Sequence, residues 1–251
     1  MFIDKNYYRD QFLWSKEHTD YDFEQLDREL VDELKVFIKD DAQTILELGG
    51  GNGQFAAAAA MAGYEVTVIE LVPEIAANIY KLREKFEIAE ERLRIITGDF
   101  YTVKLEESFD LVCYFDGFGI GHDRDQERLL KRIFHWLRED GQAFIDVYTP
   151  WYWAKTSGET MSFGQIERIY GFDAEACRMT DSWWLKGKEE EKMTQSLRCY
   201  SPADLSLLLK ETGLGISHLE AGGAMDYEAW EYKRKVALHE AMMYRVTLTK
   251  E

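Results

Sequence analysis

The chain has 251 residues, of which 46% are hydrophobic and 14% aromatic, so it can bury a full core and is not expected to be disordered. Its 47 acidic and 30 basic residues give a formal charge of -17, which repels phosphate backbones and disfavours nucleic acid as a partner. No run approaches the roughly 20 apolar residues of a membrane-spanning helix, and residues 1–10 are polar. We therefore expect a cytoplasmic protein that has no membrane partner.

The three cysteines, Cys113, Cys177 and Cys199, are odd in number and widely spaced. This pattern favours reduced thiols over a disulfide framework or a zinc site, so we expect no bound metal.

The first 150 residues alternate between helical and extended patterns. Apolar side chains at three-and-four spacing predict an amphipathic helix over residues 22–39, within an N-terminal helical segment of residues 1–40. Short apolar runs predict buried strands at residues 44–48, 65–70, 93–97, 110–115 and 143–148. Helical patterns between them cover residues 55–61, 73–82 and 126–137. This alternation predicts a parallel sheet with helices on both faces, and residues 41–150 as its core.

The alternation ends after Pro150. Three extended segments without helices between them predict an antiparallel insertion over residues 151–200. Those segments are residues 161–170, 177–184 and 193–200. Ser201 and Pro202 then begin a helix. Residues 201–251 are predicted to complete the core sheet with this helix and with strands at 216–220 and 243–249.

A glycine cluster, Gly49-Gly50-Gly51-Asn52-Gly53, lies at the first strand-to-helix junction. Glycine lets a ligand approach the backbone closely and permits positive φ, so we expect a nucleotide-type ligand here. The dinucleotide fingerprint requires glycine at its sixth position, where this chain has Gln54, and no P-loop Lys follows. Glu47, two residues before the first glycine, suits a ligand that carries a cationic group.

Glu47 with Gly49, Gly51 and Gly53 resembles the first motif of the Rossmann-like methyltransferases that use S-adenosylmethionine (SAM). The resemblance covers roughly residues 40–150. It implies an α/β fold with a mostly parallel seven-stranded sheet, helices on both faces and an antiparallel β insertion. It also implies that SAM binds and is released as S-adenosylhomocysteine (SAH), with Glu47 near the methionine portion.

Acidic residues at the ends of later strands extend the resemblance. By resemblance, Glu70 accepts hydrogen bonds from both ribose hydroxyls and Leu71 packs beside the adenine. Asp99 accepts from the adenine amino group, and Phe100 packs on the ring. Phe115 ends the fourth strand, at the switch point where open α/β sheets bind ligands.

The loop after the fourth strand, residues 116–123, should face the departing methyl group. Because positioning dominates an in-line displacement, a general base is required only when the acceptor must lose a proton. His122 is the first candidate base, and Asp116 is an alternative that could orient an amine or a hydroxyl. A histidine in a glycine-rich loop is also compatible with an exposed residue that has no catalytic role.

Aromatic and arginine side chains gather between residues 148 and 200. Aromatic walls with a few polar anchors are typical of small-molecule pockets. The segment also resembles the insertion of small-molecule methyltransferases, including those acting on amino sugars, which shapes the acceptor pocket or pairs subunits. We expect it to form either the pocket or a homodimer contact. The predicted substrate-contacting residues are Phe118, Tyr148, Trp151, Trp153 and Arg178.

Aromatic residues also precede the first core helix, at Tyr7, Tyr8, Phe12 and Trp14, and by resemblance such a segment can close over SAM.

Together these patterns predict methyl transfer from SAM to a nitrogen or oxygen of a small-molecule acceptor. Two alternatives remain open. One is a catalytically silent SAM-binding regulatory or scaffold protein, and the other is an NAD or nucleotide-sugar enzyme on a similar fold.

Overall fold

The computed structural model describes residues 5–39 and 41–251, and its largest sheet has seven strands. These are β1 (Thr44–Leu48), β2 (Glu65–Glu70), β3 (Leu93–Thr97), β4 (Phe109–Phe118), β5 (Leu137–Tyr148), β10 (Leu214–Ala221) and β13 (Met243–Lys250). Their order is β10-β13-β5-β4-β1-β2-β3. β13 pairs antiparallel with β5 and β10, whereas the pairs among β1 to β5 are parallel. The predicted mostly parallel seven-stranded sheet is confirmed.

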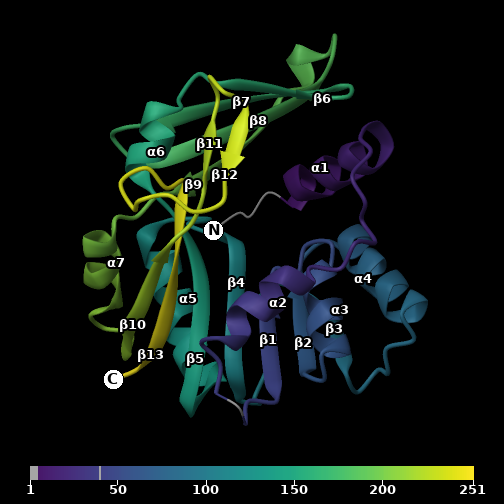
Figure 1. Cartoon of the computed structure of the whole chain (residues 1–251), viewed down its shortest axis with the longest axis vertical. Coiled ribbons are helices and arrows are strands. Elements are labelled where there is room, and N and C mark those ends of the chain that lie inside the picture. The colour runs from purple at the N-terminus through teal and green to yellow at the C-terminus, as the bar shows by residue number, and fades with distance from the viewer. Residues whose placement is uncertain (1–4, 40) are drawn as a thin grey trace.

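Helices cover both faces of this sheet (Figure 1). One face packs against α2 (Arg28–Lys35), α3 (Gln54–Met61) and α4 (Pro73–Lys85). The other packs against α5 (Asp123–Trp136) and α7 (Pro202–Leu209). Because successive side chains in a strand point to opposite faces, Ile45 of β1 packs with α3, while Leu46 and Leu48 pack with the α5 layer.

Helices α4 and α7 begin at the residues that the sequence predicts. Pro73 occupies the first turn of α4, where its missing N–H costs no hydrogen bond. At α7, the Ser201 hydroxyl accepts from the Asp204 amide at 3.2 Å, and the Asp204 carboxylate accepts from the Ser201 amide at 3.1 Å.

The predicted helix over residues 22–39 is wrong in its extent, because α2 covers residues 28–35 alone. Asp27 caps it by accepting from the Leu30 amide at 3.0 Å. Before the cap, the side-chain amide of Gln54 donates to the carbonyls of Asp22 and Gln25, at 3.0 and 2.6 Å. These contacts with the start of α3 hold the segment in turns, and a pattern within residues 22–39 cannot reveal them.

The insertion forms a separate antiparallel sheet of four strands. Its strands are β6 (Thr160–Phe163), β7 (Ile166–Asp173), β8 (Arg178–Leu185) and β9 (Met193–Arg198). It follows α6 (Pro150–Lys155) and contains a 3-10 turn, Glu189–Glu191. An unpredicted hairpin of β11 (Ala224–Asp226) and β12 (Glu231–Lys233) packs against the insertion, where Tyr227 contacts Tyr170 (Figure 1).

Helix α1 (Lys5–His18) lies within the predicted N-terminal helical segment and packs against α4, β7 and β9. Residues 1–4 and 40 of that predicted segment lie outside the described residues. No helix in the described ranges is long and apolar enough to cross a membrane.

Candidate active site

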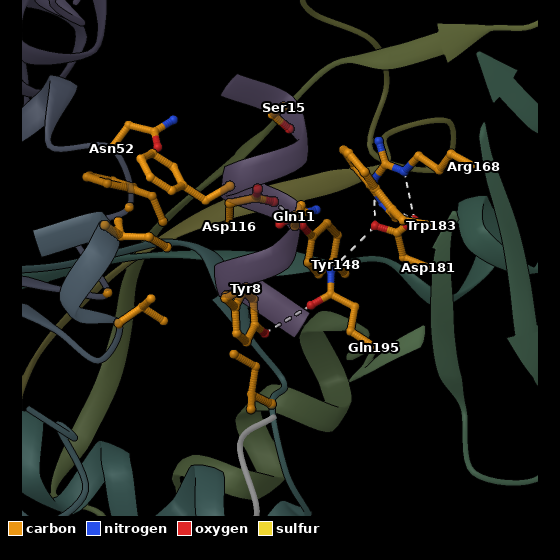
Figure 2. A pocket seen from close by; sticks show the side chains of 18 of the residues that line it. Tyr8, Gln11, Ser15, Asn52, Asp116, Tyr148, Arg168, Asp181, Trp183 and Gln195 are labelled. Carbon is orange, nitrogen blue, oxygen red and sulfur yellow. Dashed lines mark hydrogen bonds and ion pairs between the residues drawn. The ribbon is translucent and has the colours of Figure 1, made fainter. Parts of the chain in front are cut away.

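A cavity of about 960 Å³ lies where the ends of the parallel strands meet α1 and the insertion (Figure 2). Small-molecule pockets span about 300–1,000 Å³, so this cavity has room for a donor and an acceptor together. Its walls come from the segments after β1, β2 and β3, the ends of β4 and β5, helix α1, and the inner face of β7 to β9. Within the described part of the chain, no three His, Cys, Asp or Glu side chains group as metal ligands.

The glycine loop, residues 49–53, forms one wall of the cavity. Gly49 and Gly51 line the cavity with φ values of 65° and 49°, a region in which L-residues with a side chain are strained. Gly53 does not line it. Gly53 begins α3 at φ 79°, and a Cβ atom there would lie 2.8 Å from Ile79, so close packing accounts for this glycine.

Glu70 provides a buried carboxylate at this end of the cavity. It is 5% exposed and accepts from the amides of Gly51 at 3.1 Å and Val72 at 2.8 Å. Burial raises its pKa to about 7, although these backbone hydrogen bonds act in the opposite direction. A carboxylate has about four acceptor positions, so these amides leave acceptor capacity for ligand hydroxyls. This arrangement fits a ribose.

Glu47 lies behind the glycine loop and does not line the cavity directly. It is 4% exposed, and its Oε2 atom accepts no hydrogen bond within the described residues. Burial, and then the neighbouring Glu70, raise its pKa well above the usual range. A buried carboxyl oxygen without a donor is costly, and a ligand ammonium group or a water would satisfy it. The residues at this end of the cavity therefore fit SAM.

The other expected cofactor residues divide into two groups. Leu71, Phe100 and Phe115 line the cavity. Asp99 does not, because its carboxylate accepts from the Tyr101 amide at 2.8 Å and caps the turn after β3.

Asp116 occupies an irregular position in β4. The register with β5 shifts between Tyr114 and Phe118, and Asp116 has φ 51°, a left-handed conformation unusual for a residue with a side chain. Such irregularities redirect side chains, and here the carboxylate is accessible from the cavity (Figure 2). It accepts a hydrogen bond from the Tyr148 hydroxyl. Asp116 is exposed to the cavity, and the protein around the cavity limits its contact with bulk water. This desolvation raises the pKa of Asp116 to about 6, more than the hydrogen bond from Tyr148 and the charge of Arg168 lower it.

A hydrogen-bonded network forms the opposite wall, around Asp181. Arg168 donates to both Asp181 oxygens at 2.7 Å, and the Trp183 indole donates to the same carboxylate at 3.0 Å. Tyr7 donates to it at 3.2 Å. The Arg168 guanidinium also lies over the rings of Tyr170 and Trp183, at 4.4 and 5.0 Å from their centroids. The Arg168 charge is therefore neutralised and its position is fixed.

Helix α1 closes one side of the cavity and is joined to the insertion. Its lining residues are Tyr8, Gln11, Phe12 and Ser15. The Tyr8 hydroxyl donates to the Gln195 side-chain carbonyl of β9 at 2.9 Å (Figure 2). These contacts hold α1 against the insertion at the cavity wall, and closure of this segment over SAM stays a prediction.

The first candidate base, His122, lies outside the cavity. It is the N-cap residue of α5, where its backbone amide donates to Asp125 at 2.9 Å, and it is exposed. Strand β4 extends to Phe118, further than predicted, so Asp116 and Gly117 reach the cavity from the strand. Ile120 of the following loop also lines the cavity.

Two of the five expected substrate contacts, Tyr148 and Trp153, line the cavity, and three do not. Phe118 is buried against Tyr200. Trp151 is half-buried and packs against the hydrophobic cluster that contains Tyr152 and Trp153. Arg178 donates to the Gly121 carbonyl at 2.6 Å and to the Ser196 hydroxyl at 2.7 Å, so it fastens the loop after β4 to the insertion.

Arg168 and Asp181 are not among the predicted site residues, although both face the cavity. Strand alternation could have found them, since Arg168 and Tyr170 lie two residues apart on β7, as Asp181 and Trp183 do on β8. Gln195 and Tyr8 line the cavity because β9 and α1, which are far apart in the chain, come into contact. No local pattern indicates such a contact.

Comparisons with known proteins agree with this geometry. Residues 22–219 match the family described as methyltransferase domain. No curated protein matches the sequence.

Solved structures with the same fold include an S-adenosylmethionine-dependent methyltransferase from Clostridium acetobutylicum, at 13% identity and TM-score 0.69 over 98% of this chain and 99% of that one. The sugar N-methyltransferase KedS8 from Streptoalloteichus sp is 15% identical, with TM-score 0.62 over 97% and 93%. The glycopeptide N-methyltransferase MtfA complexed with SAM is also 15% identical, with TM-score 0.57 over 92% and 96%.

The family match covers most of the chain, and the cavity lies at the strand ends where the resemblance expected it. The chain therefore belongs to the methyltransferase domain family and has the fold of the SAM-dependent methyltransferases.

Proposed function

We propose that this protein transfers a methyl group from SAM to a nitrogen or oxygen of a small-molecule acceptor. The observation that carries the proposal is the single cavity that joins the Glu70 end to the Asp116 end. The sugar and glycopeptide N-methyltransferases of similar fold also support an acceptor of this kind.

In this proposal the donor occupies the end formed by Gly49, Gly51 and Glu70. The Glu70 carboxylate accepts from the ribose hydroxyls, Leu71 and Phe100 pack beside the adenine, and the Glu47 carboxyl receives a donor from the methionine portion. When bound, SAM supplies an electrophilic methyl group on a sulfonium.

The acceptor occupies the end formed by Asp116, Tyr148 and Trp153, beneath the insertion. Apolar and aromatic walls there exclude water, and Asp116 orients the nucleophile and can take its proton. Positioning by these walls supplies most of the rate enhancement expected for such a displacement.

The test is mass spectrometry of a metabolite extract incubated with the enzyme and methyl-labelled SAM. A labelled product formed with the wild-type protein supports the proposal. SAM binding without any labelled product would favour a silent SAM-binding protein. Binding of NAD in preference to SAM would favour a nicotinamide enzyme.

A further inference from the structure

The charges that face the cavity are few, and most of them are balanced. Among the described residues that line it, the charged side chains are Glu70, Asp116, Arg168 and Asp181. Glu70 lies at the glycine-loop end, on the amides of Gly51 and Val72. Arg168, the one cation among them, is paired with Asp181 through two hydrogen bonds of 2.7 Å. Among the described lining residues, Asp116 is therefore the carboxylate at the acceptor end that forms no ion pair with a cationic side chain.

Arg168 is not available to bind an anionic acceptor. Its guanidinium is held against Asp181 and lies over the rings of Tyr170 and Trp183. The Asp181 carboxylate in turn receives hydrogen bonds from Tyr7 and Trp183 as well. Drawing Arg168 toward a carboxylate or phosphate ligand would leave Asp181 buried without its counter-charge, which is strongly unfavourable.

The remaining walls suit a cation carried on an apolar body. Trp153, Tyr170 and Met179 lie on the insertion side of the cavity, and Met242 and Met243 lie beside them. Aromatic faces attract cations, and methionine packs adaptably against flat apolar groups.

Resting on the methyltransferase function proposed above, we propose that the acceptor is an amine on an aromatic or other apolar scaffold, and that the Asp116 carboxylate recognises its nitrogen. The backbone at Asp116 supports this assignment independently. A left-handed φ of 51° at a register shift is an unfavourable conformation, and such residues concentrate at functional sites.

The chemistry of the transfer also favours nitrogen over oxygen beside this carboxylate. An ammonium held by Asp116 first passes one proton to that carboxylate, which frees the nitrogen lone pair. The lone pair then forms the new N–C bond while the C–S bond breaks, and the electrons of the C–S bond remain on sulfur. The product is an N-methylammonium, and Asp116 releases its proton to solvent. A hydroxyl brings no positive charge to pair with Asp116, and an aliphatic hydroxyl passes its proton to a carboxylate far less readily than an ammonium does.

The experiment uses SAH-loaded protein and probe pairs that differ only in an amino or hydroxyl group. Suitable pairs are 2-phenylethylamine with 2-phenylethanol, and tryptamine with tryptophol. Calorimetry should show the amines binding roughly ten- to hundredfold more tightly than the alcohols, as expected for a hydrogen bond to a charged group. With labelled SAM, mass spectrometry should detect N-methyl products and no O-methyl products.

Asp116→Asn is the central variant, because asparagine also tolerates the left-handed conformation and keeps the side-chain shape. It should abolish the preference for amines. Tyr148→Phe removes the hydroxyl partner but keeps the carboxylate, and should retain the preference. The matched control, Asp140→Asn, removes one exposed negative charge outside the cavity and should behave as the wild type.

Equal binding of amines and alcohols, an amine preference that survives in Asp116→Asn, or no binding by any amine would each overturn the inference. These results remain distinct from failure of the proposed function, because SAH binding is measured first. A protein that binds neither SAM nor SAH would contradict the methyltransferase proposal itself.

Discussion

Two acidic residues, Glu47 and Glu70, lie at the ends of the adjacent strands β1 and β2 and are almost completely buried. Their environments differ. Glu70 faces the cavity and receives two backbone amides, whereas Glu47 lies behind it with one oxygen that has no partner in the described residues. Burial raises the pKa of both carboxyls, so a ligand with hydrogen-bond donors would favour their charged forms.

Replacing Glu70 with alanine should weaken SAM binding by about 1.5–3 kcal/mol, the usual contribution of hydrogen bonds to a charged group. Isothermal titration calorimetry gives the affinity, and the melting temperature verifies that the variant remains folded. Unchanged affinity in a folded Glu70→Ala protein would remove Glu70 from the binding site.

SAM affinity should also rise with pH between 6 and 8. The groups that face Glu70 are the amides of Gly51, Leu71 and Val72 and the carboxyl of Glu47. With a pKa of about 7 in the free protein, Glu70 is only about a tenth ionised at pH 6. Ribose hydroxyls favour the ionised form, so binding releases a proton and strengthens by up to about tenfold over this range. Glu70→Gln should flatten the dependence, and a wild-type affinity that falls with pH would contradict the assignment.

Among the elements, α1 joins the two halves of the cavity wall. It contacts α4 of the core and β7 and β9 of the insertion. The Tyr7 hydroxyl donates to Asp181 and the Tyr8 hydroxyl donates to Gln195, and these two hydrogen bonds hold α1 against the insertion at the acceptor end.

Tyr8→Phe should loosen this contact. One neutral hydrogen bond contributes about 0.5–1.5 kcal/mol, so SAH should dissociate about two- to tenfold faster and the amides of α1 should exchange faster with deuterium. Stopped-flow release and hydrogen exchange measure the two effects. If exchange within α1 increases while SAH release stays the same, α1 packs against the domain without retaining the ligand.

For the molecule as a whole, the site is a composite of the core sheet, the insertion and the N-terminal helix (Figure 1). A ligand that binds only the folded state therefore stabilises the core sheet, the insertion and the N-terminal helix together by mass action.

At 100 times its dissociation constant, SAM or SAH should add about 2.7 kcal/mol to the free energy of unfolding. For a chain of this size the melting temperature should rise by about 5–10 °C. Thermal denaturation with SAM, SAH and NAD at equal concentrations measures the effect, and NAD should stabilise less. Equal stabilisation by NAD would argue against a site built for SAM.

Local patterns in the chain were enough to predict the positions of β1, β2 and β3, the starts of α4 and α7, and the glycine loop. These features depend on side-chain periodicity, on proline and serine at helix starts, and on glycine at positive φ, all of which act over a few residues. The same local signals identified Glu70 and the family resemblance.

Which side chains meet in the cavity depends on contacts between segments that are far apart in the chain. Asp116 pairs with Tyr148, 32 residues away, and Tyr7 with Asp181, 174 residues away. His122 and Arg178 were plausible from their positions in the chain, but the start of α5 and the loop carbonyls bind them elsewhere. Such contacts depend on how the insertion folds over the strand ends. That arrangement is set by packing between distant segments, and no local pattern encodes such packing.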